Sequence, residues 1–284
     1  MCRWLTMPSR TPLGAYYIYQ RRGYHSVLSI YKVSYDLRER TSRGQIPRFL
    51  YVVNRTANKS DVWVFDGHKE ETRMKNLIII GARGAGREVF VTACNDLRYG
   101  KDFVVKGFLD GKKDALDGLQ EYPPILSSVE DYHPQSNDVF TCALGDPKWR
   151  KYYAEIIERK GGEFITIIDR GARIGKNVKI GKGCIIRNFV DLSADISIGD
   201  FVYIQPLSII GHDCIIGDYC HLNCYSFMGG FCHLEDMATI HTGGKVLPHV
   251  KIGTASIVGA GAVVVKSVAA NKTVVGNPAY VFEY

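Results

Sequence analysis

The neighbouring residues His212 and Asp213 form the pair in this chain that is best suited to move a proton. An imidazole titrates near neutral pH, and a carboxylate on one ring nitrogen fixes the tautomer and makes the other nitrogen more basic. Consecutive side chains of a strand point to opposite sides, so the two groups can meet only where the chain turns a corner. We therefore predict that Asp213 orients His212 as a general base at such a corner. The alternative is a solvated corner without a chemical role.

His221 is a second histidine whose position suggests chemistry. It lies one residue before an aliphatic position of the repeat described below, so we expect it to point outward from a different face than His212. The two imidazoles can cooperate only if a second subunit brings its own face alongside. The alternative for His221 is packing in an interface. His233 occupies the same position of the repeat and is less suited to a function.

A glycine-rich loop, Gly81-Ala82-Arg83-Gly84-Ala85-Gly86, follows a predicted buried strand at 77–80 and precedes a predicted helix at 88–97. Its spacing differs from the dinucleotide pattern G-x-G-x-x-G, but the strand-loop-helix context suits a phosphate at a helix N-terminus. Asp110 ends the next predicted strand, at 104–109, where an acidic residue can bind a ribose or base. The alternative is a tight turn without a ligand. With a predicted strand at 139–144 and a helix at 147–160, residues 74–165 are expected to form a small Rossmann-like α/β domain with a parallel sheet.

Seventeen positions spaced six residues apart, from Ile168 to Val264, carry an aliphatic or Met side chain. The residue two positions earlier is small or branched, and Gly follows the aliphatic residue eight times. This pattern is typical of a hexapeptide parallel β-helix, in which eighteen residues make one three-sided coil. We expect residues 166–284 to adopt this fold, with the aliphatic residues inside. We also expect the following Gly to supply the positive φ of a tight corner.

The phase of the repeat places further residues relative to His212. Gly230 follows His212 by eighteen residues, so both are expected on the same corner. Thr242 and Ala260 are also eighteen residues apart and are expected on a different corner. Small residues at stacked corners leave a groove for a long thin ligand, although corners also use small residues without any ligand.

The positive charge of the chain is concentrated before residue 74. Residues 1–73 hold 13 Lys and Arg against 6 Asp and Glu, whereas the remainder holds 23 of each, so the net charge of +7 does not indicate a nucleic-acid site in the later part. No long uncharged apolar run predicts a membrane span. Residues 1–73 are rich in Tyr and Arg, a composition that also occurs in organellar transit segments. We favour a disordered or non-native leader, with Met74 as the natural start.

The eight cysteines permit two interpretations. A metal cluster is one, because six of the Cys and His residues fall within a short segment (Cys214, Cys220, His221, Cys224, Cys232 and His233). The other is favoured, because four cysteines occupy the inward small position of the repeat, where a thiol acts as a small buried hydrophobe; they are Cys184, Cys214, Cys220 and Cys232. We therefore expect no metal, and a reducing, cytoplasmic location.

Four segments carry a resemblance to a known family: IIGARGAGREV at 79–89, GFLD at 107–110, GHDCIIGDYCH at 211–221 and GNPA at 276–279. On these residues, the segment 74–279 resembles the sugar O- and N-acetyltransferases of the NeuD/PglD type. The resemblance implies that the β-helix is left-handed and that the protein is a homotrimer. It also implies that acetyl-CoA lies in the groove between neighbouring helices and that the N-terminal domain binds a nucleotide sugar.

The resemblance also implies roles for individual residues. It makes His212 the catalytic base and Asp213 its partner. It implies contacts with acetyl-CoA for His221, Gly230, Thr242 and Ala260, and contacts with the sugar nucleotide for Arg83, Gly84, Ala85 and Asp110. Arg83 and Ala85 stand where members of the family commonly have a small residue and a His or Phe. This difference affects which sugar substrate the resemblance implies. Tyr280 stands where Lys or Arg is usual, which bears on the contact with the phosphates of CoA.

We therefore predict an acetyl-CoA-dependent acetyltransferase that acts on an amino or hydroxyl group of a nucleotide-linked sugar in surface-polysaccharide or glycan biosynthesis. Neither a metal nor a nucleic-acid partner is expected. Two alternatives belong to other classes. One is a metal-dependent hydratase on the same β-helix that uses His212, His221 and a third histidine. The other is a non-catalytic scaffold that has lost its substrate.

Overall fold

The structure is a computed structural model that describes residues 16–18, 31–33, 49–56, 59–66 and 74–283. The chain divides into two compact units, Met1–Thr72 and Arg73–Tyr284. In the first unit, four strands pair antiparallel in chain order: β1 (Tyr16–Ile18), β2 (Tyr31–Val33), β3 (Phe49–Thr56) and β4 (Lys59–Asp66). The expectation of a leader at 1–73 concerns residues that lie largely outside the described ones, and it stays a prediction.

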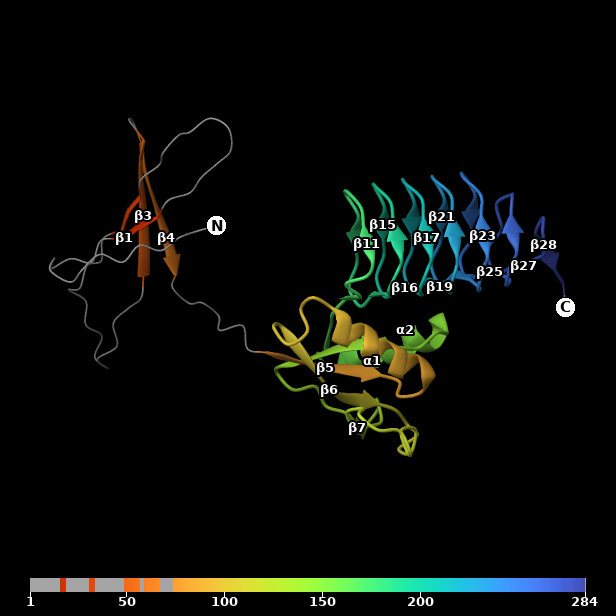
Figure 1. The fold of residues 1–284 in the computed structure, drawn as a ribbon, viewed down its shortest axis with the longest axis horizontal. Coiled ribbons are helices and arrows are strands. Elements are labelled where there is room, and N and C mark those ends of the chain that lie inside the picture. The colour runs from red at the N-terminus through yellow and green to blue at the C-terminus, as the bar shows by residue number, and fades with distance from the viewer. Residues whose placement is uncertain (1–15, 19–30, 34–48, 57–58, 67–73, 284) are drawn as a thin grey trace. The chain divides into compact units, whose positions relative to one another are not determined.

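The second unit begins with a parallel α/β sheet (Figure 1). The strand order is β7-β6-β5-β8-β9, so the order reverses at β5, whose neighbours are β6 and β8. Leu77–Ile80 are buried because they form a continuous apolar run covered on both faces. The elements are β5 (Lys75–Ile80), α1 (Gly84–Asn95), β6 (Phe103–Leu109), β7 (Ile125–Ser127), β8 (Asp138–Cys142), α2 (Pro147–Arg159) and β9 (Glu163–Phe164).

These elements match the expected α/β domain, with two differences in detail. Helix α1 begins at Gly84, inside the glycine-rich loop, four residues earlier than predicted. The strands β7 and β9 were not predicted, because two or three residues are too few to show a periodic pattern. Helix α2 begins after Asp146, whose side chain accepts from the amides of Lys148 and Trp149, with Pro147 at the first helical position.

The rest of the unit is a parallel β-helix of very short strands (Figure 1). Each strand pairs with the strand eighteen residues later, as Ile204 does with Leu222. The first face contains β10 (Ile167–Ile168), β13 (Ile185–Ile186), β16 (Tyr203–Ile204), β19 (His221–Leu222), β22 (Thr239–Ile240) and β25 (Ile257–Val258), followed by β27 (Thr273–Val275) and the antiparallel β28 (Tyr280–Phe282).

The other two faces follow the same rule. The second face contains β11 (Arg173–Ile174), β14 (Asp191–Leu192), β17 (Ile209–Ile210), β20 (Phe227–Met228), β23 (Lys245–Val246) and β26 (Val263–Val264). The third face contains β12 (Lys179–Ile180), β15 (Ser197–Ile198), β18 (Ile215–Ile216), β21 (His233–Leu234) and β24 (Lys251–Ile252). The aliphatic position of the repeat is buried from Ile186 to Val264, so the predicted β-helix is confirmed.

The corners correct one expectation about glycine. The positive φ falls three residues after the aliphatic position, for example at Asp213 (56°) and Phe231 (60°), and not at the Gly that directly follows it. That Gly is required because the next coil passes close by. A Cβ on Gly199 would lie 2.2 Å from Oδ1 of Asp218, too close for any side chain. The close contact between successive coils therefore explains why Gly directly follows the aliphatic position. The prediction that this Gly has a left-handed backbone was wrong.

The inward cysteines behave as small core residues, as predicted. Cys184, Cys214, Cys220 and Cys232 are buried. Each thiol donates to a carbonyl fifteen residues further along the chain, for example Cys214 Sγ to Gly229 O at 3.1 Å and Cys220 Sγ to Glu235 O at 3.0 Å. Among the described residues, no three His, Cys, Asp or Glu side chains are grouped as a metal ion would require.

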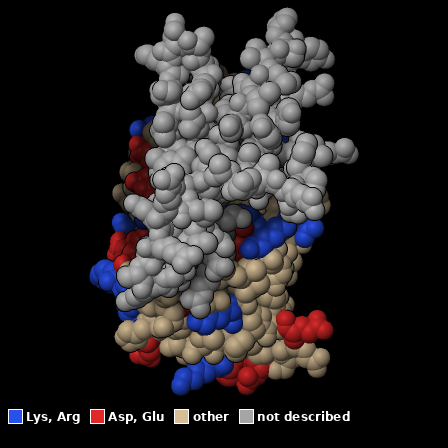
Figure 2. All heavy atoms as spheres, turned by 90° about the vertical axis from the view of Figure 1, so that its left-hand side faces the viewer, with Lys and Arg blue, Asp and Glu red and all other residues tan. Residues whose placement is uncertain are grey.

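The helices and the charged surface bear on whether the protein meets a membrane or nucleic acid. Neither α1 nor α2, the helices of the described chain, has the length and apolar character needed to cross a bilayer. Where described atoms are visible in Figure 2, acidic and basic side chains are interspersed. The described atoms that are visible in this view therefore form no continuous basic surface of the kind that attracts nucleic acid.

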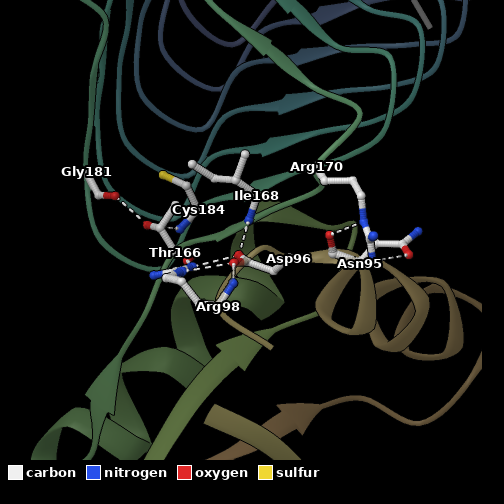
Figure 3. Close-up of polar contacts among 8 residues, drawn as sticks. All are labelled: Asn95, Asp96, Arg98, Thr166, Ile168, Arg170, Gly181 and Cys184. Atoms are coloured by element: carbon white, nitrogen blue, oxygen red, sulfur yellow. Dashed lines mark hydrogen bonds and ion pairs between the residues drawn. The ribbon is translucent and has the colours of Figure 1, made fainter. Parts of the chain in front are cut away.

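The α/β domain is attached to the β-helix at its first coil (Figure 3). Asp96 is buried and accepts from Arg98 Nε at 2.9 Å, from Arg98 Nη2 at 2.7 Å and from the Ile168 amide at 2.9 Å. Arg98 Nη2 also donates to Thr166 O at 2.5 Å. Burial alone would raise the pKa of Asp96, but the hydrogen bonds from Arg98 and Ile168 outweigh it and hold that pKa below its usual value. Asp96 is therefore ionised and ties the end of α1 to the β-helix.

Candidate active site

His212 and Asp213 lie in the corner between β17 on the second face and β18 on the third face. Nδ1 of His212 is 2.8 Å from Oδ2 of Asp213. The left-handed backbone of Asp213 (φ 56°) allows both side chains to project from the same corner. The two side chains are 55% and 44% exposed, so a ligand can reach them. The predicted contact between the two groups is therefore present.

The next coil fixes the other side of the imidazole. A Cβ on Gly230 would lie 2.6 Å from Cε1 and 2.7 Å from Nε2 of His212, so the ring occupies the space that a side chain at 230 would need. The Phe231 ring stands edge to face against the imidazole, with centroids 5.1 Å apart and an interplanar angle of 89°. Within the described part of the chain, Nε2 of His212 has no hydrogen-bond partner. The geometry leaves Nε2 available to accept a proton.

His221 lies elsewhere, on β19 of the first face, and is 6% exposed. One ring nitrogen, Nε2, is 3.1 Å from Gln205 Nε2, and the ring also forms a hydrogen bond with the backbone of Gly145. The ring stacks on Tyr203, with centroids 5.1 Å apart. Burial first, and then the charge of Arg150, lower the pKa of His221 to about 3, so it is neutral near pH 7. As expected, His221 projects from a different side of the β-helix than His212, which lies in the corner between the other two faces. The α/β domain of the same chain covers His221.

The other predicted cofactor residues fall on two corners. Gly230 shares the corner of His212, where Phe231 N donates to His212 O at 3.0 Å. Thr242 and Ala260 stack on the corner between the first and second faces, where Gly261 N donates to Thr242 O at 2.9 Å. The two corners are opposite edges of the second face, as the phase of the repeat predicts. Within one protomer they do not form a single groove.

A pocket with a volume of about 210 Å³ lies at the carboxyl ends of β5, β6 and β8. This is where the strand order reverses, the position at which open α/β sheets bind ligands. Of the predicted sugar-nucleotide residues, Arg83, Ala85 and Asp110 line the pocket, whereas Gly84 does not. The pocket is also lined by Glu130, Leu144 and Tyr153, none of which was predicted as a site residue. The one available signal was that Leu144 ends the strand predicted at 139–144.

Asp110 holds the pocket loops in place. Its Oδ2 accepts from the Ala82 amide at 3.0 Å and its Oδ1 accepts from the Lys112 amide at 2.9 Å. Nε of Arg83 is 4.0 Å from Oδ2 of Asp110, and the Arg83 side chain is mostly exposed. The carboxylate therefore connects the loop after β5 to the loop after β6. Its contact with a ribose or base stays a prediction.

Within one protomer, the pocket and His212 lie on different sides of the β-helix. The α/β domain packs on the first face, where Tyr203 and His221 are buried and Arg187 Nη1 bonds Glu88 Oε2 at 2.7 Å. His212 projects from the corner between the other two faces. A ligand in the pocket of one chain cannot meet the imidazole of the same chain without crossing the β-helix.

Comparisons with known proteins match both parts of this unit. The family described as "PglD N-terminal domain" matches residues 76–157, and "Bacterial transferase hexapeptide (six repeats)" matches residues 195–230. The structure of WeeI from Acinetobacter baumannii AYE is 32% identical, with a TM-score of 0.64, and the likeness covers 74% of this chain and 100% of that one. The structure of PerB from Caulobacter crescentus, in complex with CoA and GDP-perosamine, is 26% identical, with a TM-score of 0.65 and coverage of 73% and 97%.

A curated relative is the UDP-N-acetylbacillosamine N-acetyltransferase of Bacillus subtilis (strain 168), which is 32% identical over 119 residues. That match covers 40% of this chain and 51% of the relative, so the chain spans about half the length of the curated protein that it matches. The fold thus defines the class: a PglD-type N-terminal α/β domain joined to a hexapeptide β-helix. With a likeness that spans the whole of WeeI, the chain belongs to the NeuD/PglD-type sugar acetyltransferase family.

Proposed function

We propose that this protein transfers the acetyl group of acetyl-CoA to an amino or hydroxyl group of a nucleotide-linked sugar. The observation that carries the proposal is the hydrogen bond between His212 and Asp213 at an exposed corner of the β-helix. This bond uses Nδ1 of His212 and leaves its Nε2 available to accept a proton. The ligands of PerB, CoA and GDP-perosamine, support both substrates. The N-acetyltransferase name of the curated relative favours an amino acceptor.

The chemistry follows from the free nitrogen of His212. The acceptor nitrogen or oxygen attacks the thioester carbonyl, and Nε2 of His212 takes the proton that the acceptor loses. The new bond to the carbonyl carbon forms, the carbon–sulfur bond breaks, and the CoA sulfur leaves as a thiol with the proton from the imidazolium. Asp213 stabilises the imidazolium through Nδ1. A positioned base of this kind contributes about 10²–10⁴ in rate, and holding both substrates together supplies the rest.

The remaining assignments are parts of the same proposal. Acetyl-CoA is bound by His221, Gly230, Thr242 and Ala260, and the sugar nucleotide by Arg83, Gly84, Ala85 and Asp110. His221 is the least accessible member of the first set, because it is buried and hydrogen-bonded within its own protomer. No metal is part of the proposed reaction.

The proposed functional unit is a homotrimer. Large apolar side chains surround the His212 corner and are about half exposed; they are Ile209, Ile215 and Phe231. Covering them with a neighbouring β-helix would remove this apolar surface from water. The same contact would bring the corner of Thr242 and Ala260 from one copy toward the corner of His212 and Gly230 from another. It would also bring the pocket of the α/β domain in one chain close to His212 of a different chain.

We also propose the division into a leader at 1–73, an α/β domain at 74–165 and the β-helix at 166–284. A cytoplasmic location is supported by the thiols. All cysteines within the described residues are free, and several of them lie deep in the β-helix core. Such thiols persist in a reducing compartment.

The test is the variant His212→Ala, assayed with acetyl-CoA and GDP-perosamine by the release of free thiol. We expect the loss of acetyl transfer while the protein stays trimeric by light scattering. His233→Ala, a histidine on the third face, is the matched control and should keep wild-type activity. Full activity of His212→Ala would remove the assignment of the base.

A further inference from the structure

Arg150 connects the α/β domain to the β-helix through four backbone carbonyls. It lies in the first turn of α2 and is 1% exposed. Nη1 donates to Leu144 O at 2.6 Å and to Gly145 O at 3.2 Å. Nη2 donates to Tyr219 O at 2.6 Å and to Cys220 O at 3.0 Å. The first two carbonyls follow β8, and the other two precede β19, so one guanidinium joins both parts.

This arrangement is unfavourable for a charged group. The groups that act on Arg150 electrostatically are thiols and a phenol, chiefly Cys142, Cys220 and Tyr203, and none of these is a carboxylate. Burial lowers the pKa of Arg150, and among the residues that the structure describes its Nε has no hydrogen-bond partner. A cation near the start of a helix is also disfavoured by the helix dipole. An apolar side chain at this position would leave the carbonyls of Leu144 and Tyr219 without the donor that they have now, so the guanidinium is needed for the contact that it makes between the two parts.

The carbonyls that Arg150 holds belong to the wall of the pocket. Leu144 lines the pocket, and Gly145 is the next residue. Gly145 lies directly on His221, because a Cβ at 145 would be 3.2 Å from Cε1 of that ring. The loop after β8 therefore rests on β19, and Arg150 fixes it from the other side. The Asp96–Arg98 contact with the first coil is a second attachment (Figure 3). Two separated attachments restrain the angle between the domain and the β-helix.

We propose that Arg150 is a positioning residue that holds the pocket at a fixed place on the β-helix, so that a sugar bound there reaches His212 of a neighbouring copy. The inference rests on the proposed function. Transfer between two sites depends on distance, and a misplacement of about 1 Å far from the chemistry can cost about 10²-fold in rate. Arg150 does not touch the substrates, and its effect is expected on turnover rather than on binding of CoA.

The experiment compares Arg150→Met and Arg150→Lys with Arg159→Met, which changes an exposed arginine in the last turn of the same helix. Turnover is measured with acetyl-CoA and GDP-perosamine, and the number of CoA sites and their Kd by calorimetry. For both Arg150 variants we expect kcat to fall about tenfold or more, with the Kd and the number of CoA sites unchanged. The control should match the wild type. Arg150→Lys keeps the positive charge, but its ammonium group cannot reach four carbonyls. This variant therefore tests the positioning role if Arg150→Met does not fold.

Wild-type kcat in both Arg150 variants would overturn the proposal. So would a fall in kcat that matches a fall in the number of CoA sites, because that would be a loss of folded protein. If the wild type itself transfers no acetyl group, the proposed function fails, and hydrogen exchange then tests Arg150 separately. Amides at 143–146 and 219–222 should exchange about tenfold faster or more in Arg150→Lys than in the wild type. Equal exchange would refute the positioning role.

Discussion

Replacing Gly230 with Ala should separate catalysis from stability. The added Cβ would lie 2.6 Å from Cε1 and 2.7 Å from Nε2 of His212. Ordinary carbon contacts are about 3.5–4.0 Å, so the imidazole must move by about 1 Å. The backbone of Gly230 is not left-handed, because it is absent from the positive-φ residues. The new methyl group therefore strains the histidine and not the main chain.

The expected size of the effect follows from that displacement. A shift of about 1 Å in a reacting group costs about 10²-fold in rate, which corresponds to about 3 kcal/mol of activation free energy. The hydrogen bond between Nδ1 and Asp213 must lengthen or break at the same time. By contrast, a Gly to Ala change at a compatible backbone position stabilises a protein by about 0.4–1 kcal/mol through the unfolded state. We therefore expect kcat to fall about 10²-fold while the free energy of unfolding hardly changes.

The assay is acetyl transfer at saturating acetyl-CoA, together with urea unfolding of the same preparation. Gly171→Ala is the matched control, because the nearest atom to an added Cβ at this position is 3.2 Å away. Gly171 also lies in the first coil, away from His212. It should keep wild-type kcat. If Gly230→Ala retains wild-type kcat, the position of the imidazole over Gly230 has no importance for the reaction, and the reasoning is refuted.

Two further predictions concern the same histidines. Asp213→Asn keeps the size of the side chain but removes its charge, so kcat should fall by about 10²-fold or more with unchanged unfolding, and an unchanged kcat in thiol-release assays would contradict the role of Asp213. His221 has a folded-state pKa of about 3 against about 6.5 in the unfolded chain, so the unfolded state binds more protons between these values. The free energy of unfolding should therefore fall as the pH drops from about 6.5 toward 3, by up to about 1.4 kcal/mol per pH unit. His221→Gln should lack this contribution, and equal pH dependence of urea unfolding in both proteins would contradict the burial of a neutral imidazole.

The features that could be predicted from sequence are those set by local geometry. The six-residue period alone places Ile210 inside, and its pairing with Met228 follows from the eighteen-residue coil. The contact between His212 and Asp213 is local as well, since adjacent side chains can meet at a corner. The same logic placed Gly230 over His212, because stacking in a β-helix is a direct function of sequence separation.

The features that sequence did not reveal depend on contacts between distant segments. Arg150 and Tyr219 are 69 residues apart, and nothing near either residue signals their hydrogen bond. The burial of His221 depends on how the loop around Gly145 packs on β19. The glycine assignment failed for the same reason, because the nearby atoms of Asp218 that exclude a side chain at Gly199 belong to the following coil.

The left-handed residues at the corners determine how small a piece of this β-helix can exist by itself. Bulky residues such as Phe201, Tyr219 and Phe231 adopt positive φ there, at about 1–2 kcal/mol each. A coil has three corners, so a solitary coil would carry several kcal/mol of unfavourable backbone energy with no neighbour to offset it. Stacked coils recover that energy through inter-coil hydrogen bonds and buried aliphatic side chains. A fragment of one or two coils should consequently remain unfolded, because it has too few interfaces between coils to offset the energy of its corners.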